Sequence, residues 1–304
     1  MKVRAIVNPR AGAGARRALA ALEQAPAGLH GLAVSLSERA GHARELAREA
    51  AQAGCDLVLA VGGDGTANEV AWGLLGSQAA LGLVPVGSGN GLARTLGIPL
   101  APRRALQALA DAVTRRMDVG FVNERPFLNV AGAGFDAAVG AAFHERARAG
   151  ARRGVLGYVW AGLGIALGYR ASTLGREGAE PSGRAALLFS FSNGPQYGGG
   201  AVIAPGARLD DGLLDVVRIE DAPRLRLLLQ APRLFLGGIE RLPAYSRPAL
   251  ASFVPTAGEP FPYHRDGEPE PPVARLEVRI EPKALPVLVA RPVAEDPRGP
   301  FLPA

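Results

Sequence analysis

The sequence predicts two domains: a doubly wound α/β domain with a parallel sheet, followed by a domain of mainly antiparallel sheet. Two apolar runs of strand character end in glycine turns, at residues 62–65 and 87–91, which is typical of parallel strands linked by helices. After residue 121 the strand-like runs become short, often alternate in polarity and are separated by Gly, Pro and Asp. A length of 304 residues allows each domain to bury a core of its own.

In the first domain, strand-like and helix-like segments alternate. We expect strands over residues 2–7, 32–36, 57–61 and 80–86, and a further strand that begins at residue 117. We expect helices over residues 15–24, 41–53 and 103–113, and a further helix that begins at residue 66. Because the carboxyl ends of parallel strands lie at one edge of a sheet, the two glycine turns should come together there and bind a ligand. We place the end of this domain at residue 122, so that it spans residues 1–122.

The turn after strand 57–61 carries one carboxylate, Asp64, among glycines. Glycines let the backbone approach a ligand closely, and Thr66 can cap a helix whose N-terminal N–H groups and dipole favour an anion such as phosphate. Asp64 would repel phosphate unless a cation lay between them, and proteins commonly hold Mg²⁺ with one or two carboxylates plus phosphates. A purely structural turn between strand and helix could use the same glycines.

The second domain is expected over residues 123–285, after a linker near 120–126. Its predicted elements are strands over 127–131, 185–191, 200–204, 213–219 and 274–280, and helices over 136–149 and 155–169. Residues 286–304 are expected to form a C-terminal tail that can return to the first domain and is loose from residue 294 onward, where it contains three prolines.

Charge and composition limit the partners of the chain. A formal charge of +6 and a pI near 10.1 permit attraction to nucleic acid, anionic lipid or phosphorylated substrates. Aromatic residues make up only 6%, and no basic stretch alternates with them, so we expect no nucleic-acid partner. A single cysteine, Cys55, excludes a disulfide framework, and the N-terminus lacks the pattern of a signal peptide. These features predict a cytoplasmic protein.

One segment of the second domain has the composition of a membrane-surface element. Residues 155–169 are apolar nearly all round but too short to span a bilayer, and they follow Arg146, Arg148, Arg152 and Arg153. An apolar helix next to an arginine cluster suits an anionic membrane, so we expect reversible membrane association. A helix buried against the second sheet would need the same composition.

Four stretches together resemble the diacylglycerol kinase catalytic-domain family of lipid kinases, in particular its soluble bacterial members. They are Val7-Asn8-Pro9 with Gly12 and Gly14, Gly62-Gly63-Asp64-Gly65-Thr66 with Asn68-Glu69, Pro85-Val86-Gly87-Ser88-Gly89-Asn90, and His264-Arg265-Asp266-Gly267-Glu268. Between the last two, Tyr197 to Gly200 and Pro205 to Asp215 resemble the stretch that leads to an Asp-Gly turn in this family. The resemblance covers nearly the whole chain, and the ordered set is far more specific than any one glycine turn.

The resemblance implies a fold and an activity. The fold is an α/β nucleotide-binding domain of the NAD-kinase/phosphofructokinase-like type plus a mainly antiparallel β-sandwich domain for the lipid, with ATP between them. The activity is transfer of the γ-phosphoryl group of ATP to the hydroxyl of a diacylglycerol-like or sphingoid lipid at the membrane surface, with Mg²⁺ as cofactor. A homodimer is compatible with this resemblance.

The resemblance also implies roles for individual residues. Asp64 serves the catalytic Mg²⁺ through water, with Asp118 as a further member of the acidic network. Asp266, which follows the turn-rich segment 260–265, matches the general base, and Glu268 lies beside it. The positions that match nucleotide contacts are Asn8, Ser37, Gly62, Gly63, Gly65, Thr66, Gly87, Ser88 and Asn90.

A second, structural Mg²⁺ site is implied near residue 211. Its ligands are the side chain of Asp211 and the backbone carbonyls of Arg208 and Leu213, although an ordinary hairpin turn would carry the same Asp-Gly pair. The chain departs from many bacterial members at Gly91, where they carry an aspartate. Ser-Gly-Asn followed by a small residue is instead similar to sphingosine and ceramide kinases, which leaves the acceptor lipid open.

Two other functions fit part of the pattern. An NAD kinase shares Gly-Gly-Asp-Gly and a related fold, but residues 87–90 and the Asp-Gly-Glu stretch fit lipid kinases better. A catalytically silent lipid-binding regulatory protein is suggested by Gly91, whereas the presence of both Asp64 and Asp266 favours an enzyme.

Overall fold

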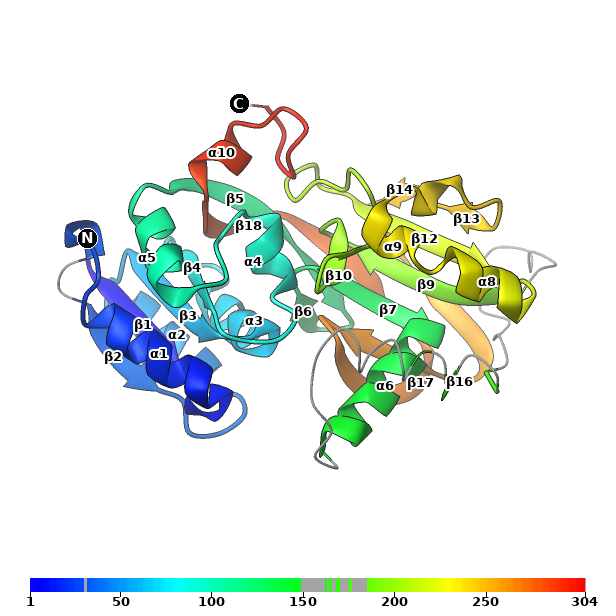
Figure 1. Ribbon diagram of the computed structural model, residues 1–304, viewed down its shortest axis with the longest axis horizontal. Coiled ribbons are helices and arrows are strands. Elements are labelled where there is room, and N and C mark those ends of the chain that lie inside the picture. The colour runs from blue at the N-terminus through cyan, green and yellow to red at the C-terminus, as the bar shows by residue number, and fades with distance from the viewer. Residues whose placement is uncertain are drawn as a thin grey trace. The chain divides into compact units, whose positions relative to one another are not determined.

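The computed structural model describes residues 1–29, 32–148, 162, 164–165, 168–169, 175–176 and 185–303 (Figure 1). The chain forms two compact units. The first comprises residues 1–119, 208–211 and 282–304, and the second comprises residues 120–207 and 212–281. Most of the predicted helix 155–169 lies outside the described residues, as do Arg152 and Arg153.

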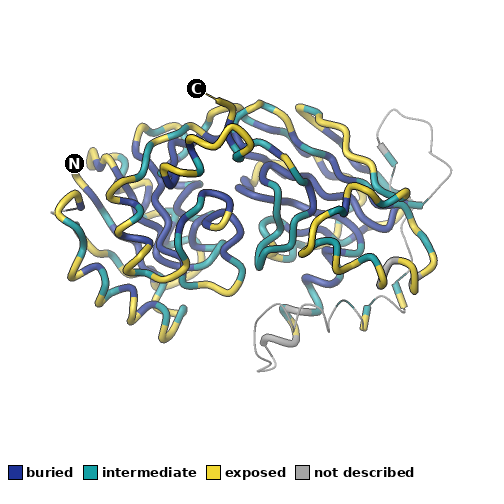
Figure 2. Tube along the Cα trace, turned by 45° about the horizontal axis from the view of Figure 1, so that its top comes forward, coloured by how far each residue is buried: buried dark blue, intermediate teal, exposed yellow. Residues whose placement is uncertain are grey.

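The first unit is built on a largely parallel sheet. Its strands lie in the order β2 (Ala33–Leu36), β1 (Val3–Val7), β3 (Leu57–Gly62), β4 (Ala80–Pro85), β18 (Val278–Val289) and β5 (Val113–Val122). The pairs β1/β2, β1/β3, β3/β4 and β4/β18 are parallel, with Leu59 opposite Gly82. Every residue of β3 and β4 is buried, which explains why both strands read as continuous apolar runs (Figure 2).

Helices follow the strands of the first unit. They are α1 (Ala13–Leu22), α2 (His42–Gln52), α3 (Asp64–Leu74), α4 (Gly91–Thr95), α5 (Pro102–Ala110) and α10 (Arg291–Ala294), with single 3-10 turns at Pro9–Ala11 and Ala27–Leu29. Helices α2 and α3 pack closely because a Cβ on Gly73 would overlap the carbonyl oxygen of Arg44. The Glu69 carboxylate of α3 accepts the N–H groups of Gly41 at 2.9 Å and Ala43 at 3.2 Å, so it caps the N-terminus of α2.

The C-terminal residues belong to the first unit. Phe301 is buried, and its carbonyl accepts a hydrogen bond from the guanidinium of Arg208 at 2.8 Å. The sequence predicted a loose tail from residue 294 onward, and this prediction is wrong for Phe301. Segment 208–211 joins the same unit, because the N–H of Leu209 donates to the carbonyl of Pro300 at 2.7 Å.

The second unit is a sandwich of two antiparallel layers. One sheet has the order β13 (Tyr245–Ser246), β12 (Leu214–Glu220), β9 (Ala186–Ser192), β7 (Val130–Gly134), β16 (Pro255–Arg265) and β17 (Glu268–Arg275), with β14 (Ala249–Leu250) beside β12 and β8 (Gly175–Arg176) beside β16. The other layer contains β6 (Arg125–Phe127), β15 (Ser252–Phe253) and the parts of β5 and β18 in this unit. A separate ribbon pairs β10 (Gln196–Gly198) with β11 (Ala201–Val202). Among the described residues of this unit, the helices with given bounds are α6 (Phe135–Arg148), α8 (Arg224–Gln230) and α9 (Arg233–Leu236), with a 3-10 turn at Ile239–Arg241.

Two hydrophobic clusters form the core of the second unit. One lies between the layers, where Phe127 of β6 joins Phe191 of β9 and Phe261 of β16. The other cluster contains Leu187 and Leu188 of β9. Strand β9 therefore contributes to both clusters and is buried along its whole length.

Three predicted segments differ from the structure. Segment 260–265, expected to be turn-rich, is part of strand β16. Its prolines, Pro260 and Pro262, lie where the β16/β17 register shifts, so the missing N–H groups do not interrupt a regular ladder. The predicted strand 200–204 is reduced to two residues, and 274–280 is divided between β17 and β18.

Candidate active site

The two glycine turns of the first unit meet at the carboxyl edge of β3 and β4. A Cβ on Gly87 would lie 2.6 Å from the Cα of Gly63, so the backbones approach this closely only because Gly87 lacks a side chain. Oδ1 of Asp64 accepts the N–H of Gly91 at 2.8 Å and ties one turn to the other. A Cβ on Gly89 would lie 2.8 Å from Oδ2 of Asp64. The prediction that these turns come together is confirmed.

Asn90 closes the second turn. Its backbone is left-handed, with φ of 49°, which asparagine tolerates better than most residues. Its Oδ1 accepts the N–H of Gly87 at 3.1 Å, and its Nδ2 donates to the carbonyl of Gly87 at 2.7 Å. Ser88, inside this ring, is exposed. The buried asparagine thus shapes a loop whose outer residues face solvent or a ligand.

Asn8 and Thr66 connect the end of β1 to the first turn of α3. Nδ2 of Asn8 donates to Oγ1 of Thr66 at 3.2 Å. A side chain on Gly62 would overlap the Thr66 hydroxyl, so glycine is required before the turn. Ser37 directly follows β2 at the same edge. The predicted nucleotide residues thus gather at the ends of four neighbouring strands.

In the second unit, Asp266 holds the turn between β16 and β17. Its carboxylate accepts N–H groups from Leu128 at 2.8 Å, Asn129 at 2.9 Å and Val130 at 3.2 Å, and its own N–H donates to the carbonyl of Val130 at 2.9 Å. The backbone of Asp266 is left-handed, with φ of 46°. Both carboxylate oxygens are therefore engaged in fixing the turn to the segment that leads into β7.

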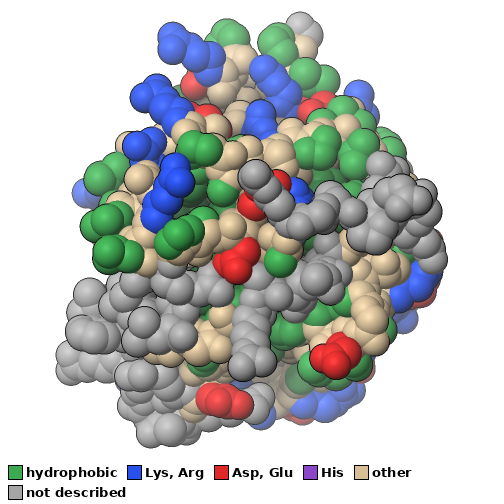
Figure 3. Space-filling model, turned by 90° about the vertical axis from the view of Figure 1, so that its right-hand side faces the viewer, with side chains coloured by type: hydrophobic (Ala, Val, Ile, Leu, Met, Phe, Trp, Pro, Cys, Tyr) green, Lys and Arg blue, Asp and Glu red, His purple; other side chains and the backbone are tan. Residues whose placement is uncertain are grey.

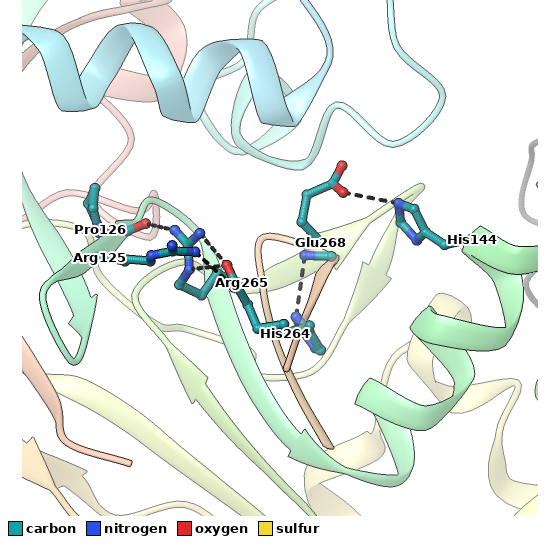
Figure 4. A network of polar contacts seen from close by, with 8 residues as sticks. Arg125, Pro126, His144, His264, Arg265 and Glu268 are labelled. Carbon is teal, nitrogen blue, oxygen red and sulfur yellow. Dashed lines mark hydrogen bonds and ion pairs between the residues drawn. The ribbon is translucent and has the colours of Figure 1, made fainter. Parts of the chain in front are cut away.

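Glu268, two residues later, is placed differently (Figure 4). It begins β17, and its side chain is 59% exposed. Its Oε2 lies 3.2 Å from Nε2 of His144 on α6. Close by, Arg265 pairs with Glu270 and donates to the carbonyl of Pro126 at 2.7 Å. Of the two carboxylates in this turn, Glu268 is the more exposed.

A buried polar cluster supports the same turn. Oδ2 of Asp136 accepts the hydroxyl of Tyr197 at 2.9 Å and lies 3.2 Å from Nε2 of His264. Burial raises the pKa of the Tyr263 phenol, which belongs to the hydrophobic cluster between the layers. The sequence analysis did not identify His144 or Asp136, and it named Tyr197 and His264 only as parts of family stretches.

Comparison with known families identifies both parts of the chain. Residues 2–122 match the diacylglycerol kinase catalytic domain, and residues 129–289 match the YegS C-terminal NAD kinase beta sandwich-like domain. The chain belongs to the diacylglycerol kinase catalytic-domain family. The resemblance expected from the four sequence stretches is confirmed.

Individual relatives agree with this assignment. A probable lipid kinase YegS-like protein of Chromohalobacter salexigens is 34% identical over 221 residues, which cover 70% of this chain and 68% of the relative. A diacylglycerol kinase of Mycobacterium tuberculosis is 34% identical over 249 residues, which cover 78% of this chain and 79% of the relative. A crystal structure of a diacylglycerol kinase from Bacillus anthracis has a TM-score of 0.71 and 21% identity, covers 96% of this chain and 98% of its own, and supports the fold alone.

In this member of the diacylglycerol kinase family, Asp64 is the residue expected to serve Mg²⁺ together with phosphate. Asp64 is half-buried in the first turn of α3. Among the described residues, no group of three or more His, Cys, Asp and Glu side chains could hold a metal by itself. Mg²⁺ usually keeps several waters and binds one or two carboxylates plus substrate phosphates. A single carboxylate such as Asp64 is compatible with that mode of binding.

Asp118, the predicted companion of Asp64, is fully buried in β5 of this kinase-family fold. Its Oδ1 accepts the N–H of Lys283 at 2.6 Å, and its own N–H donates to the carbonyl of Leu209 at 2.6 Å. These bonds join β18 and segment 208–211 to β5. They give Asp118 a structural role that its residue type alone did not predict.

The ligands predicted for the structural Mg²⁺ are distributed over both units. Arg208 and Asp211 lie in the first unit, and Leu213 lies in the second. Gly212 has a φ of 74°, as expected for an Asp-Gly turn. Strand β12, which follows, pairs with β9, β13 and β14 and not with the preceding β11, so this turn does not close a hairpin.

Proposed function

We propose that this chain is an ATP-dependent lipid kinase that transfers the γ-phosphoryl group to the hydroxyl of a diacylglycerol-like or sphingoid lipid. The observation that carries the proposal is the bond from the Gly91 N–H to Asp64, which fixes a carboxylate where two glycine turns can offer N–H groups to phosphate. The name of the Mycobacterium tuberculosis relative favours diacylglycerol. Gly91 favours a sphingoid acceptor, so the proposal includes both lipid classes.

ATP would bind at the carboxyl edge of the first unit. Its phosphates would accept N–H bonds from residues 63–66 and 87–89, where glycines leave the backbone open, with Asn8 and Ser37 nearby. Mg²⁺, held through water by Asp64, would neutralise charge on the transferred group when bound. Asp64 itself orients the site by its bond to the second turn.

Two further metal assignments rest on the family resemblance. Asp118 would belong to the acidic network of the catalytic Mg²⁺. Asp211, with the carbonyls of Arg208 and Leu213, would hold a structural Mg²⁺. Metal titration of the Asp118→Asn and Asp211→Asn variants tests these two sites. We also propose that the chain forms a homodimer.

The transfer requires a group that accepts the hydroxyl proton. A bond forms between the lipid hydroxyl oxygen and the γ-phosphorus, the bond to the bridging oxygen breaks, ADP leaves, and the hydroxyl proton passes to a base. Both oxygens of Asp266 already accept N–H groups, whereas the Glu268 side chain is 59% exposed. We therefore propose Glu268 as the proton acceptor and Asp266 as the residue that holds the turn. This exchanges the roles expected from the sequence.

We also propose that the kinase contacts the membrane surface through α8 and α9. Four of their side chains are exposed, Leu225 by 71%, Leu229 by 70%, Phe235 by 45% and Leu236 by 85%. The stretch 222–239 contains three arginines and no acidic residue, and Figure 3 shows hydrophobic and basic side chains next to one another on one face. This composition suits an anionic interface. Among the described residues, no helix is long and apolar enough to cross a bilayer.

A phosphorylation assay with γ-labelled ATP tests the proposed function. Dispersed diacylglycerol, sphingosine and ceramide are the candidate acceptors, and NAD is the competing one. We expect Mg²⁺-dependent labelling of a lipid and none of NAD. Labelled NAD alone would support an NAD kinase. A folded, ATP-binding protein that labels no acceptor would support the silent lipid-binding alternative.

A further inference from the structure

One face of helix α6 lies against the turn that carries Glu268. Asp136, Gly140 and His144 are spaced four residues apart, so they lie on the same side of the helix. A Cβ on Gly140 would lie 3.9 Å from the carbonyl oxygen of Gly267, which is ordinary van der Waals contact. One turn further along, His144 reaches Glu268, with 3.2 Å between Nε2 and Oε2. The helix thus touches the turn at successive points.

Asp136 makes the first of these contacts, with His264. This contact is buried, and its hydrogen-bond partners define which imidazole nitrogen carries the proton. Nδ1 of His264 accepts the N–H of Gly267 at 3.3 Å, so the imidazole proton is on Nε2. That proton faces Oδ2 of Asp136 at 3.2 Å, and both side chains are at least nine-tenths buried. A side chain on Gly132 would overlap Oδ2 of Asp136. Gly132 therefore makes room for the bond that anchors α6 to the turn.

The contact between His144 and Glu268 also depends on where the hydrogens lie. Nδ1 of His144 lies 3.1 Å from the carbonyl oxygen of Gly140, and a carbonyl can only accept, so Nδ1 carries a hydrogen. Nε2 then faces the carboxylate oxygen of Glu268 at 3.2 Å. Two acceptors would repel each other at this distance, so a proton lies between them.

We propose that His144 is a positioning residue, which holds the Glu268 carboxylate through the proton on Nε2, while the Asp136–His264 bond fixes α6 to the same turn. This inference rests on the proposed role of Glu268 as proton acceptor. Holding the carboxylate matters because a misplacement of about 1 Å costs on the order of 10²-fold in rate. Two other charged groups of this hairpin, Arg265 and Glu270, pair with each other.

Two amide substitutions separate this role from simple packing. In His144→Gln the amide nitrogen can take the place of Nε2 and donate to Glu268, whereas in His144→Asn the shorter amide takes the place of Nδ1 and does not reach it. We expect His144→Asn to lower kcat by about 10- to 100-fold with little change in the KM for ATP. We expect His144→Gln to retain most of the activity. Glu145→Gln, on the exposed neighbour, should match the wild type in kcat and thermal midpoint.

The result that overturns the inference is a His144→Asn enzyme with wild-type kcat, or equal losses in the Asn and Gln variants together with a lowered thermal midpoint. Glu268→Gln, measured in parallel, separates the positioning role of His144 from the proton-acceptor role of Glu268. If Glu268→Gln lowers kcat and His144→Asn does not, the positioning role fails and the proposed function stands. If Glu268→Gln itself retains full kcat, the assignment of the proton acceptor fails.

Discussion

Replacing Asp266 by Asn distinguishes a residue that shapes the turn from one that takes a proton. Asn tolerates the left-handed backbone at φ 46°, so the change removes charge and one acceptor without adding strain. The carboxylate accepts three N–H groups, of Leu128, Asn129 and Val130, and the amide oxygen can keep at most two of them. Each bond to a charged acceptor contributes about 1.5–3 kcal/mol, so we expect Asp266→Asn to lose about 2 kcal/mol of unfolding free energy.

The control is Glu268→Gln, whose side chain is 59% exposed. We expect its unfolding free energy to stay within about 0.5 kcal/mol of the wild type, and its kcat to fall by about 10² to 10⁴-fold, as for loss of a general base. Urea unfolding followed by circular dichroism gives the stability, and steady-state kinetics with ATP and the best lipid acceptor give kcat. An Asp266→Asn protein with wild-type stability and a larger kcat loss than Glu268→Gln would refute this reasoning and restore Asp266 as the base.

Two further predictions concern other parts of the second unit. Gly132→Ala should destabilise the protein by about 1–3 kcal/mol, because the new methyl group overlaps the carboxylate of Asp136 in a packed interior, and thermal unfolding measures this loss; an unchanged midpoint would contradict the packing described. Leu229→Glu combined with Leu236→Glu should lower sedimentation with anionic vesicles while leaving transfer to a micellar short-chain acceptor unchanged; vesicle binding that is indifferent to both changes would exclude α8 and α9 as the contact surface.

The site in the first unit could be predicted from the sequence because parallel topology itself brings strand ends together. Once strands 57–61 and 80–86 were identified, their glycine turns had to share an edge, and the 2.8 Å bond between Asp64 and the Gly91 N–H is a consequence of that geometry. Single residues at the edge were harder to interpret. Glu69 lies within the family motif, yet its carboxylate caps α2.

The second unit was less predictable because its key contacts join distant parts of the chain. The donors to Asp266 lie just before β7 and at its first residue, more than 130 positions away, and no spacing rule connects them. The same holds for the bond between His264 and Asp136, which are 128 positions apart. The match of Asp266 to the general base came from the family motif, which could not reveal the N–H groups that its carboxylate accepts in the folded chain.

Mg²⁺-dependent transfer of γ-labelled phosphate to lipid by the wild type and by Asp64→Asn tests the central claim most directly. An asparagine oxygen can still accept the Gly91 N–H, so the fold and the contact between the turns should persist, while the charge that would serve Mg²⁺ is lost. We predict a wild type that labels a diacylglycerol-like or sphingoid lipid, and a folded Asp64→Asn protein with no Mg²⁺-dependent transfer. Near-normal Mg²⁺-dependent turnover by Asp64→Asn would contradict the account.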